Sequence, residues 1–201
     1  MICGVHTISL STADPPAEAP QRRKGKIAGW PLGDFVAGPE NALARVAIEQ
    51  LLRREGPHLV VFYGSAGMGK SLIARGLYER TVSQRGAKRV SLMTGADFAR
   101  AHADASDTDA VEDFLQRFAG VELFILDDLE DLAGKGAAQR TLMTLLDHFE
   151  NSGAFVVVTC DRSPLESNQL EPRLASILSA GLSAPLEPPG LAARRTIFSR
   201  L

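Results

Sequence analysis

Residues 64–71 have the sequence GSAGMGKS, which matches the pattern G-x-x-x-x-G-K-[ST]. An apolar run, residues 59–63, precedes them, and an amphipathic pattern follows. Glycines let such a loop turn tightly, so that backbone N–H groups and the start of the next helix converge on phosphate oxygens. In this pattern Lys70 reaches the β- and γ-phosphates and Ser71 ligates Mg²⁺. A glycine-rich turn with a chance Lys-Ser pair is the alternative, expected in roughly 1% of chains of this length. The residues predicted to bind nucleotide phosphates are Gly64, Ser65, Ala66, Gly67, Met68, Gly69, Lys70, Ser71 and Leu72.

Two carboxylates follow another apolar run, residues 121–126, and resemble a Walker B element. Open α/β sheets bind ligands at the carboxyl ends of their strands. We therefore expect Asp127 to hold Mg²⁺ through water and Asp128 to orient or deprotonate the attacking water, with Lys70 stabilising charge. Strands often end in aspartate for turn formation alone, so the pairing with the loop at residues 64–71 gives this prediction its weight.

A third polar strand end follows residues 154–159, where Thr159 and Asp161 close an apolar run. If this strand lies between the other two, a polar side chain at its tip contacts the γ-phosphate or the water beside it. Thr159 and Asp161 are therefore candidate sensors of the nucleotide. An ordinary strand end with an aspartate in the following turn is the alternative.

The elements that must position these residues alternate between short apolar runs and helical patterns. That alternation predicts an α/β protein, a P-loop NTPase with a five-stranded parallel sheet and helices on both faces, in the expected order 5-1-4-3-2. The predicted strands are residues 59–63, 89–93, 121–126, 154–159 and 182–186. The predicted helices are residues 40–54, 69–84, 96–103, 111–118, 137–151, 171–178 and 191–201.

Composition restricts the class of protein further. A chain of 201 residues with 45% hydrophobic content can bury one substantial core. Its formal net charge of −2 provides no global basic field, so any nucleic-acid contact would come from a local patch. Two distant cysteines, Cys3 and Cys160, fit a reduced setting, and no apolar stretch approaches the ~20 residues needed to cross a bilayer. We expect a soluble, cytoplasmic protein.

The N-terminal segment differs in composition from the rest. Residues 1–30 contain three prolines and the basic cluster at residues 22–26, and we expect them to form a flexible arm before a nucleotide-binding core at residues 31–201. The basic cluster could contact nucleic-acid phosphates, and a solvated linker is the alternative. A short edge strand at residues 5–10, where apolar and polar residues alternate, is also open.

Three segments together resemble a known family. Residues 35–47 (FVAGPENALARVA) resemble the nucleotide-base box of the bacterial replication initiator DnaA and its relatives in the AAA+ class. Residues 123–164 resemble that family's Walker B, following helix and sensor strand, and residues 170–189 resemble its arginine-bearing segment and last strand. The resemblance covers about residues 31–201 and implies an AAA+ core that binds ATP or ADP with Mg²⁺. It places Phe35, Val36, Gly38 and Asn41 near the adenine and ribose.

The chain also departs from this family. Ile177 stands where related initiators carry an arginine that reaches a neighbouring subunit's ATP, and only Arg173 remains nearby. Ala137 stands where an arginine contributes to single-strand DNA contact. The sequence ends within the first helix after the sheet, before the family's lid and helix-turn-helix, so we expect no origin-sequence recognition by this chain alone. Hydrolysis is expected to be slow, because an aliphatic side chain cannot stabilise transition-state charge.

Three functions follow from these patterns. The first is a nucleotide-dependent regulator or accessory factor in replication initiation, with a DnaA-like initiator or another replication protein as partner. The second is an adaptor whose AAA+ core is a non-hydrolysing scaffold. The third is a helicase-loader-like or transposition-helper ATPase, which would bind single strands in a strongly salt-dependent way.

Overall fold

The computed structural model describes Leu32 and residues 35–199. The predicted N-terminal arm, with its basic cluster and its possible edge strand, lies outside the described residues. The boundary between arm and core therefore stays a prediction.

A single parallel sheet forms the centre of the fold, and its strands follow the order β2-β3-β4-β1-β5. This is the predicted order 5-1-4-3-2 viewed from the other edge. Every predicted apolar run forms a strand, and the bounds shift by one or two residues at some ends. The strands are β1 (Leu59–Tyr63), β2 (Val90–Thr94), β3 (Leu123–Asp127), β4 (Phe155–Cys160) and β5 (Leu182–Pro185).

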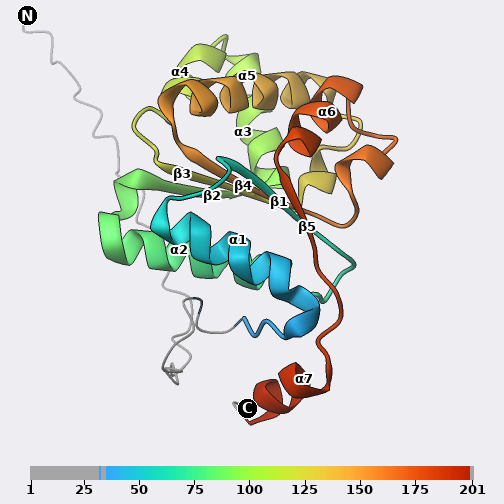
Figure 1. Cartoon of the computed structure of the whole chain (residues 1–201). Coiled ribbons are helices and arrows are strands. Elements are labelled where there is room, and N and C mark those ends of the chain that lie inside the picture. Colours follow the sequence, from blue (N-terminus) through green and yellow to red (C-terminus); the bar gives the residue numbers. More distant parts are fainter. Residues whose placement is uncertain (1–31, 33–34, 200–201) are drawn as a thin grey trace, which may run out of the picture.

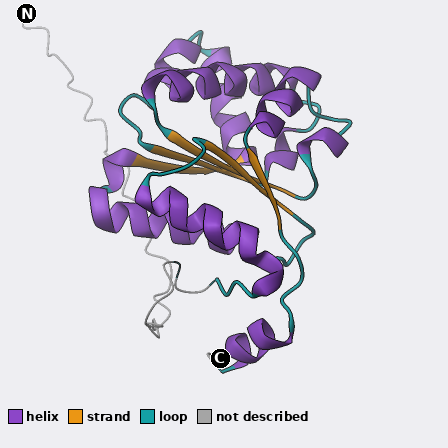
Figure 2. Ribbon diagram, in the orientation of Figure 1, coloured by secondary structure: helices purple, strands orange, loops and turns teal. Residues whose placement is uncertain are grey.

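Helices cover both faces of this sheet (Figures 1 and 2). Figure 1 shows α1 and α2 on one face and α3, α4, α5 and α6 on the other, while α7 lies beyond these layers. The helices are α1 (Ala42–Arg53), α2 (Lys70–Arg85), α3 (Gly95–Asp107), α4 (Val111–Gln116), α5 (Gly136–Ser152), α6 (Pro172–Ala180) and α7 (Leu191–Phe198). No helix within the part of the chain that the structure describes is both long and apolar enough to cross a bilayer.

Alternation along the central strands builds two separate cores. In β3, Phe124 and Leu126 pack toward the layer of α3, α5 and α6, whereas Leu123 and Ile125 pack toward α1 and α2. Successive strand residues point to opposite faces, so a strand covered on both sides must be apolar throughout. This explains why the three central strands, β1, β3 and β4, begin as continuous apolar runs rather than alternating ones.

Helix α3 extends four residues beyond its predicted end at residue 103. The added turn contains mostly polar residues, which weakened the sequence pattern, but Ala105 is buried against the core of that layer. Tertiary packing therefore sets the end of this helix. At its other end, the Thr94 hydroxyl accepts a hydrogen bond from the Asp97 N–H at 3.0 Å and caps the helix.

Candidate nucleotide-binding site

The loop between β1 and α2 depends on glycine at several points. Gly67 and Gly69 have φ angles of +84° and +94°, in the left-handed region that glycine favours. A β-carbon at Gly64 would lie 2.6 Å from the carbonyl oxygen of Leu186, so a larger residue would displace the backbone. At Gly69 it would lie 3.1 Å from the ring of Phe35. The loop therefore lies between Phe35, which precedes α1, and Leu186, which follows β5.

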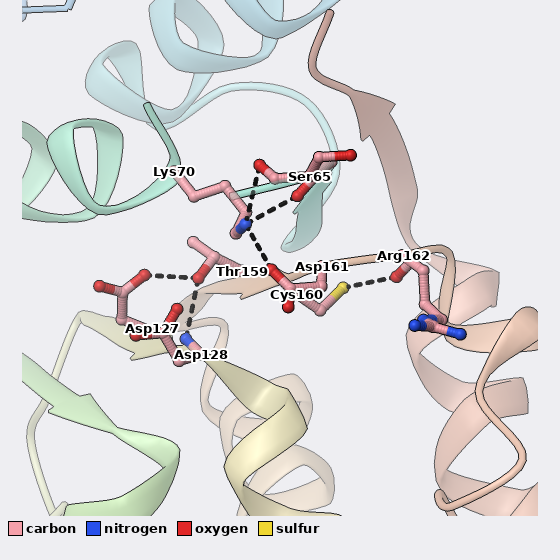
Figure 3. A network of polar contacts seen from close by, with 9 residues as sticks. Ser65, Lys70, Asp127, Asp128, Thr159, Cys160, Asp161 and Arg162 are labelled. Carbon is pink, nitrogen blue, oxygen red and sulfur yellow. Dashed lines mark hydrogen bonds and ion pairs between the residues drawn. The ribbon is translucent and has the colours of Figure 1, made fainter. Parts of the chain in front are cut away.

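Lys70 lies at the centre of the site, where α2 begins (Figure 3). Its Nζ donates hydrogen bonds to the Gly64 carbonyl at 2.7 Å, the Ser65 carbonyl at 3.3 Å and Asp161 Oδ1 at 2.7 Å. The lysine side chain is buried, and its ammonium group holds the pKa of Asp161 below the ordinary value. A buried ammonium ion needs anionic partners, so this group is poised to exchange one anion for another.

Thr159, at the end of β4, joins the two carboxylates of the Walker B element. Its buried hydroxyl donates to Asp127 Oδ1 at 2.5 Å and accepts the Asp128 backbone N–H at 3.0 Å (Figure 3). One threonine thus fixes the side chain of Asp127 and the backbone of Asp128. Through these two bonds Thr159 fixes the positions of the two acids relative to β4.

Asp128 has the properties of a proton acceptor. Its φ angle is +58°, a left-handed conformation that aspartate tolerates better than most residues and that begins a 3₁₀ turn. Burial, followed by the neighbouring charges of Asp127 and Asp131, raises the pKa of its carboxyl group. A raised pKa makes a carboxylate a better general base near neutral pH.

A cavity of about 510 Å³ opens above these groups. It brings together the phosphate loop, the end of β3 and the end of β4, as the sequence predicted. Lining residues are Ala66, Gly67, Gly69, Lys70, Ser71, Leu72, Arg75, Asp128, Glu130 and Asp161. Asp127 and Thr159 are buried and do not line it, and Gly64, Ser65 and Met68 belong to the loop without lining it.

Two of these lining residues, Arg75 and Glu130, escaped the sequence analysis. Arg75 follows Ser71 by four residues on α2, a spacing that places both on one helix face and could have identified it. Glu130 lies in the 3₁₀ turn after Asp128, and burial raises its pKa to about 7, with the charge of Asp161 adding to the effect. Its Oε2 atom is buried and has no hydrogen-bond partner among the described residues. No sequence pattern signals this carboxyl group.

The residues predicted for the base end lie elsewhere. Phe35 is buried beside the loop, and Val36 and Gly38 are half-buried. Asn41 is also buried, and its side-chain amide bonds both backbone polar groups of Glu187, at 3.0 and 2.9 Å. None of these four residues lines the 510 Å³ cavity, although the Phe35 ring lies beside Gly69 of the loop.

The positions that depart from the family occupy distinct surroundings. Ile177 is half-buried on α6 and packs against the core, while Arg173 is exposed on the same helix. Ala137 is exposed in the first turn of α5. Together with Lys135 and Arg100 it lines a separate groove of about 500 Å³.

Ser71, which lines the cavity, offers a hard hydroxyl oxygen for Mg²⁺, whereas the buried Asp127 carboxylate, bonded to Thr159, would act on the ion through water. Among the described residues, no group of three or more histidine, cysteine, aspartate or glutamate side chains could hold a metal by itself. Mg²⁺ is usually bound by one or two protein oxygens together with substrate phosphates and water. The residues present therefore fit a magnesium ion that binds with a nucleotide.

The sheet order, the phosphate loop and the acids at the end of β3 define the core of an AAA+ ATPase. A family model described as the bacterial DnaA ATPase domain matches residues 29–185. The chain therefore belongs to the DnaA ATPase domain family.

Individual relatives agree with this assignment. The chromosomal replication initiator protein DnaA of Neisseria gonorrhoeae is 29% identical over 168 residues, which cover 83% of this chain and 32% of that protein. Domain III of DnaA from Thermotoga maritima superimposes with a TM-score of 0.79 and 26% identity, covering 87% of this chain and 73% of that one. AMPPCP-bound DnaA from Aquifex aeolicus gives 0.78 and 22%, covering 87% and 55%. The chain spans about a third of the length of the curated relative.

Proposed function

We propose that this chain binds ATP or ADP with Mg²⁺ at the cavity above Lys70 and acts as a nucleotide-dependent regulator or accessory factor in the initiation of DNA replication. The observation that carries the proposal is the Lys70 ammonium group, buried at the start of α2 between loop carbonyls and Asp161. The similarity to an AMPPCP-bound DnaA supports a nucleotide as the ligand.

Binding exchanges the partner of Lys70. A polyphosphate carries more negative charge than the single carboxylate of Asp161, and the loop's N–H groups and the start of α2 add further stabilisation. Lys70 would then contact the β- and γ-phosphates in place of Asp161, and Ser71 and, through water, Asp127 would hold Mg²⁺. Because Asp161 directly follows β4, the strand that contains Thr159, this release of Asp161 would couple the phosphates to the Walker B acids through β4.

Hydrolysis is proposed to be slow. Asp128 would accept the proton of the attacking water, and a Mg²⁺ ion held by Ser71 and Asp127 would supply neutralisation of the phosphate charge. Ile177 supplies no cation at the position where the family's arginine acts in trans, so part of the transition-state charge lacks compensation. We expect a turnover well below about 1 s⁻¹ for the isolated chain, and a faster rate would contradict this part of the proposal.

The partner is proposed to be a DnaA-like initiator or another replication protein. Immobilised initiator of the DnaA family and the purified chain, mixed in ATP, in ADP or without nucleotide, provide the test by biolayer interferometry. A nucleotide switch predicts that the affinity of the wild type for the initiator differs at least about fivefold between these states. It also predicts that Lys70→Ala loses the tighter binding. Unchanged binding by Lys70→Ala in all three states would instead support an adaptor scaffold.

The scaffold has one observation in its favour. Lys70 already satisfies its hydrogen-bonding capacity through Asp161 and two loop carbonyls, so the core is internally bonded around the site. For a helicase-loader-like activity, we propose that the exposed side chains of Arg100 and Lys135, in the separate groove of about 500 Å³, contact single strands. Single-strand binding that falls steeply with salt and with Lys135→Ala would favour that third function.

A further inference from the structure

We infer that an arginine cluster at the amino edge of the sheet, where the parallel strands begin, binds the phosphate backbone of duplex DNA without reading its sequence. The cluster consists of Arg54, Arg85 and Arg89, which surround the carboxylate of Glu122. Glu122 precedes β3 and Asp127 ends it, so about 17 Å of extended strand separate the cluster from the Walker B acids. The cluster does not line the nucleotide cavity, and the inference goes beyond the proposed function and does not depend on it.

One carboxylate neutralises only part of the charge of this cluster. Glu122 Oε2 accepts hydrogen bonds from Arg54 Nη1 and, at 3.3 Å, from Arg85 Nη1. Its Oε1 forms an ion pair with Arg89 Nη1 at 3.3 Å. Within the described part of the chain, Glu122 is the only acid that pairs with these three arginines. Three guanidinium groups and one carboxylate therefore leave an excess of two positive charges.

Two other exposed arginines each have a carboxylate of their own. Arg100 pairs with Asp97 at 2.8 Å, and Arg140 pairs with Glu171 at 2.7 Å. These pairs are electrically balanced. The cluster around Glu122 is not balanced, so an external anion can supply the missing negative charge.

Neighbouring residues enlarge the positive surface. Arg53 and Lys88 are exposed and adjoin Arg54 and Arg89 in the chain, and Glu55 adds one acid. These two cations and one acid raise the excess from two to three positive charges, although the chain as a whole has a formal net charge of −2. A local positive excess on a weakly acidic chain favours contact with a polyanion at this surface.

The cluster is fixed by contacts within the protein. The Glu122 N–H donates to the Arg89 carbonyl at 2.7 Å, and the Glu122 carbonyl accepts the Phe155 N–H at 2.9 Å, so backbone bonds hold the central acid. The Arg54 guanidinium lies 5.5 Å from the centre of the Phe155 ring. Groups that are fixed in advance lose less conformational freedom when a ligand binds.

Most donors of the three arginines are free to bind an external acceptor. Each guanidinium group has five N–H donors, and Glu122 accepts one from Arg54 and one from Arg85. The side chains of Arg54, Arg85 and Arg89 are 31%, 42% and 55% exposed. Their planar forks match the oxygens of a phosphate group, and such charge-assisted contacts are stronger than those between neutral groups.

The shape of this surface suits an extended ligand. The hollow between Arg54, Arg85 and Glu122 has a volume of about 20 Å³, which holds about one water molecule and is too small for a phosphate ester. Phe155 lines the hollow but is buried, and His58 stacks on it at 4.6 Å, so the Phe155 ring is not available to stack on an unpaired base. Contacts with the phosphates of a duplex need neither a pocket nor a stacking platform, and they carry no sequence information.

Fluorescence anisotropy of a labelled short duplex, titrated with the full chain at several salt concentrations, tests the inference. The wild type should bind with an affinity that falls linearly with salt on logarithmic axes. Arg85→Ala and Arg89→Ala should each weaken binding about threefold and lower the salt slope by about 1, because each loses one phosphate contact. Arg140→Ala removes an exposed arginine that has its own carboxylate, and as the matched control it should bind like the wild type. The basic residues 22–26 are present in every variant, so the differences report on the cluster.

Glu122→Gln separates a DNA-binding role from a purely structural one. The substitution keeps the size of the side chain but removes the only acid of the cluster, so the excess of positive charge rises from two to three. If the cluster only ties α1, α2 and β3 together, the variant melts at a lower temperature and its DNA binding is unchanged or weaker. If the cluster binds DNA, the folded variant binds the duplex about threefold more tightly and with a steeper salt slope.

Lys88→Ala provides a second route, because this side chain is exposed and forms no ion pair among the described residues. It should weaken duplex binding about twofold without affecting folding. Wild-type protein that does not bind duplex DNA at low salt, or arginine variants that bind as well as Arg140→Ala, would overturn the inference. Tighter binding of a single strand or of polyglutamate that is lost in the same variants would also overturn it, because the ligand would then be another polyanion. Failure of the chain to bind ATP would refute the proposed function and leave this test unaffected.

Discussion

The phosphate end of the site and its base end are held together in different ways. At the phosphate end, Lys70 begins α2 after the loop that follows β1, and Thr159 and Asp161 lie at the end of the adjacent strand β4. They meet because parallel strands end at one edge of the sheet. At the base end, Asn41 and Glu187 lie 146 residues apart in the chain and meet through one paired hydrogen bond. The first arrangement follows from the topology, whereas the second depends on particular side chains.

The two regions also differ in the roles that their residues can have. In the proposed function, the phosphate end would supply charge and metal ligands, which a nucleotide of any base would use. The turn at residues 35–41 is instead connected to α7, because Glu40 accepts the N–H of Gly190, the residue before that helix. Substitutions at the two ends should therefore have distinguishable effects, and the following predictions run from the largest to the smallest.

Lys70→Ala should abolish the phosphate end's contribution to binding. We expect ATP and ADP affinity to fall about 100-fold, or about 2.7 kcal/mol, because charge-assisted contacts to two phosphates are lost. Titration calorimetry measures the effect, with Lys135→Ala as a control that removes an exposed lysine. A loss below about fivefold would mean that the base end, rather than the phosphate cradle, dominates affinity.

Thr159→Val should destabilise the phosphate end without altering the base end. The substitution keeps the side chain's shape but leaves Asp127 Oδ1 and the Asp128 N–H without their shared partner. We expect a cost of about 2 kcal/mol, which lowers the melting temperature by about 4–8 °C for a chain of this size. Thr159→Ser, which retains the hydroxyl group, is the control. Equal melting temperatures for the two variants would show that these hydrogen bonds do not organise the acids.

Glu130→Gln should change how stability depends on pH. The Glu130 pKa is about 7 in the folded state against an ordinary value of 4.5, so between these values the folded state retains a proton that the unfolded state has lost. Stability from this group therefore falls as the pH rises from about 4.5 to about 7. Glutamine removes that loss.

Thermal unfolding at several pH values measures this effect. Because Glu130 is partly exposed, we discount the effect for solvent screening to about 1 kcal/mol, or about 2–4 °C. Glu130→Gln should melt close to the wild type at pH 5 and above it at pH 8. A difference that is the same at both pH values would contradict the raised pKa. Glu166→Gln, at an exposed position, controls for the loss of a charge.

The sequence predicted the sheet order, and it placed the loop residues, Asp128 and Asp161 in one site, because their signals are contiguous; it missed Arg75 and Glu130, which also line the cavity. Gly64, Lys70 and Ser71 belong to one short pattern, and Asp128 and Asp161 follow apolar runs that had to be strands. The same analysis could not predict the ion pair between Lys70 and Asp161, since it depends on side-chain conformations of residues 91 positions apart. It also could not predict the raised pKa of Glu130, which arises from burial.

The hydrogen-bond partners of Glu40 and Asn41 were even harder to predict from the sequence. The resemblance placed Asn41 near the adenine, but a sequence pattern contains no information about the partner of a buried amide. The Glu187 backbone and the Gly190 N–H became partners only because β5 ends beside β1 and returns the chain to the start of α1. Long-range hydrogen bonds of this kind require the tertiary structure.

The central claim is that the glycine loop and Lys70 bind the phosphates of adenosine nucleotides. Isothermal titration of the purified chain with ATP and with ADP, each with and without Mg²⁺, tests it most directly. We predict saturable heat with one nucleotide per chain and tighter ATP binding when Mg²⁺ is present. The absence of any heat of binding for both nucleotides at millimolar concentration would contradict the claim.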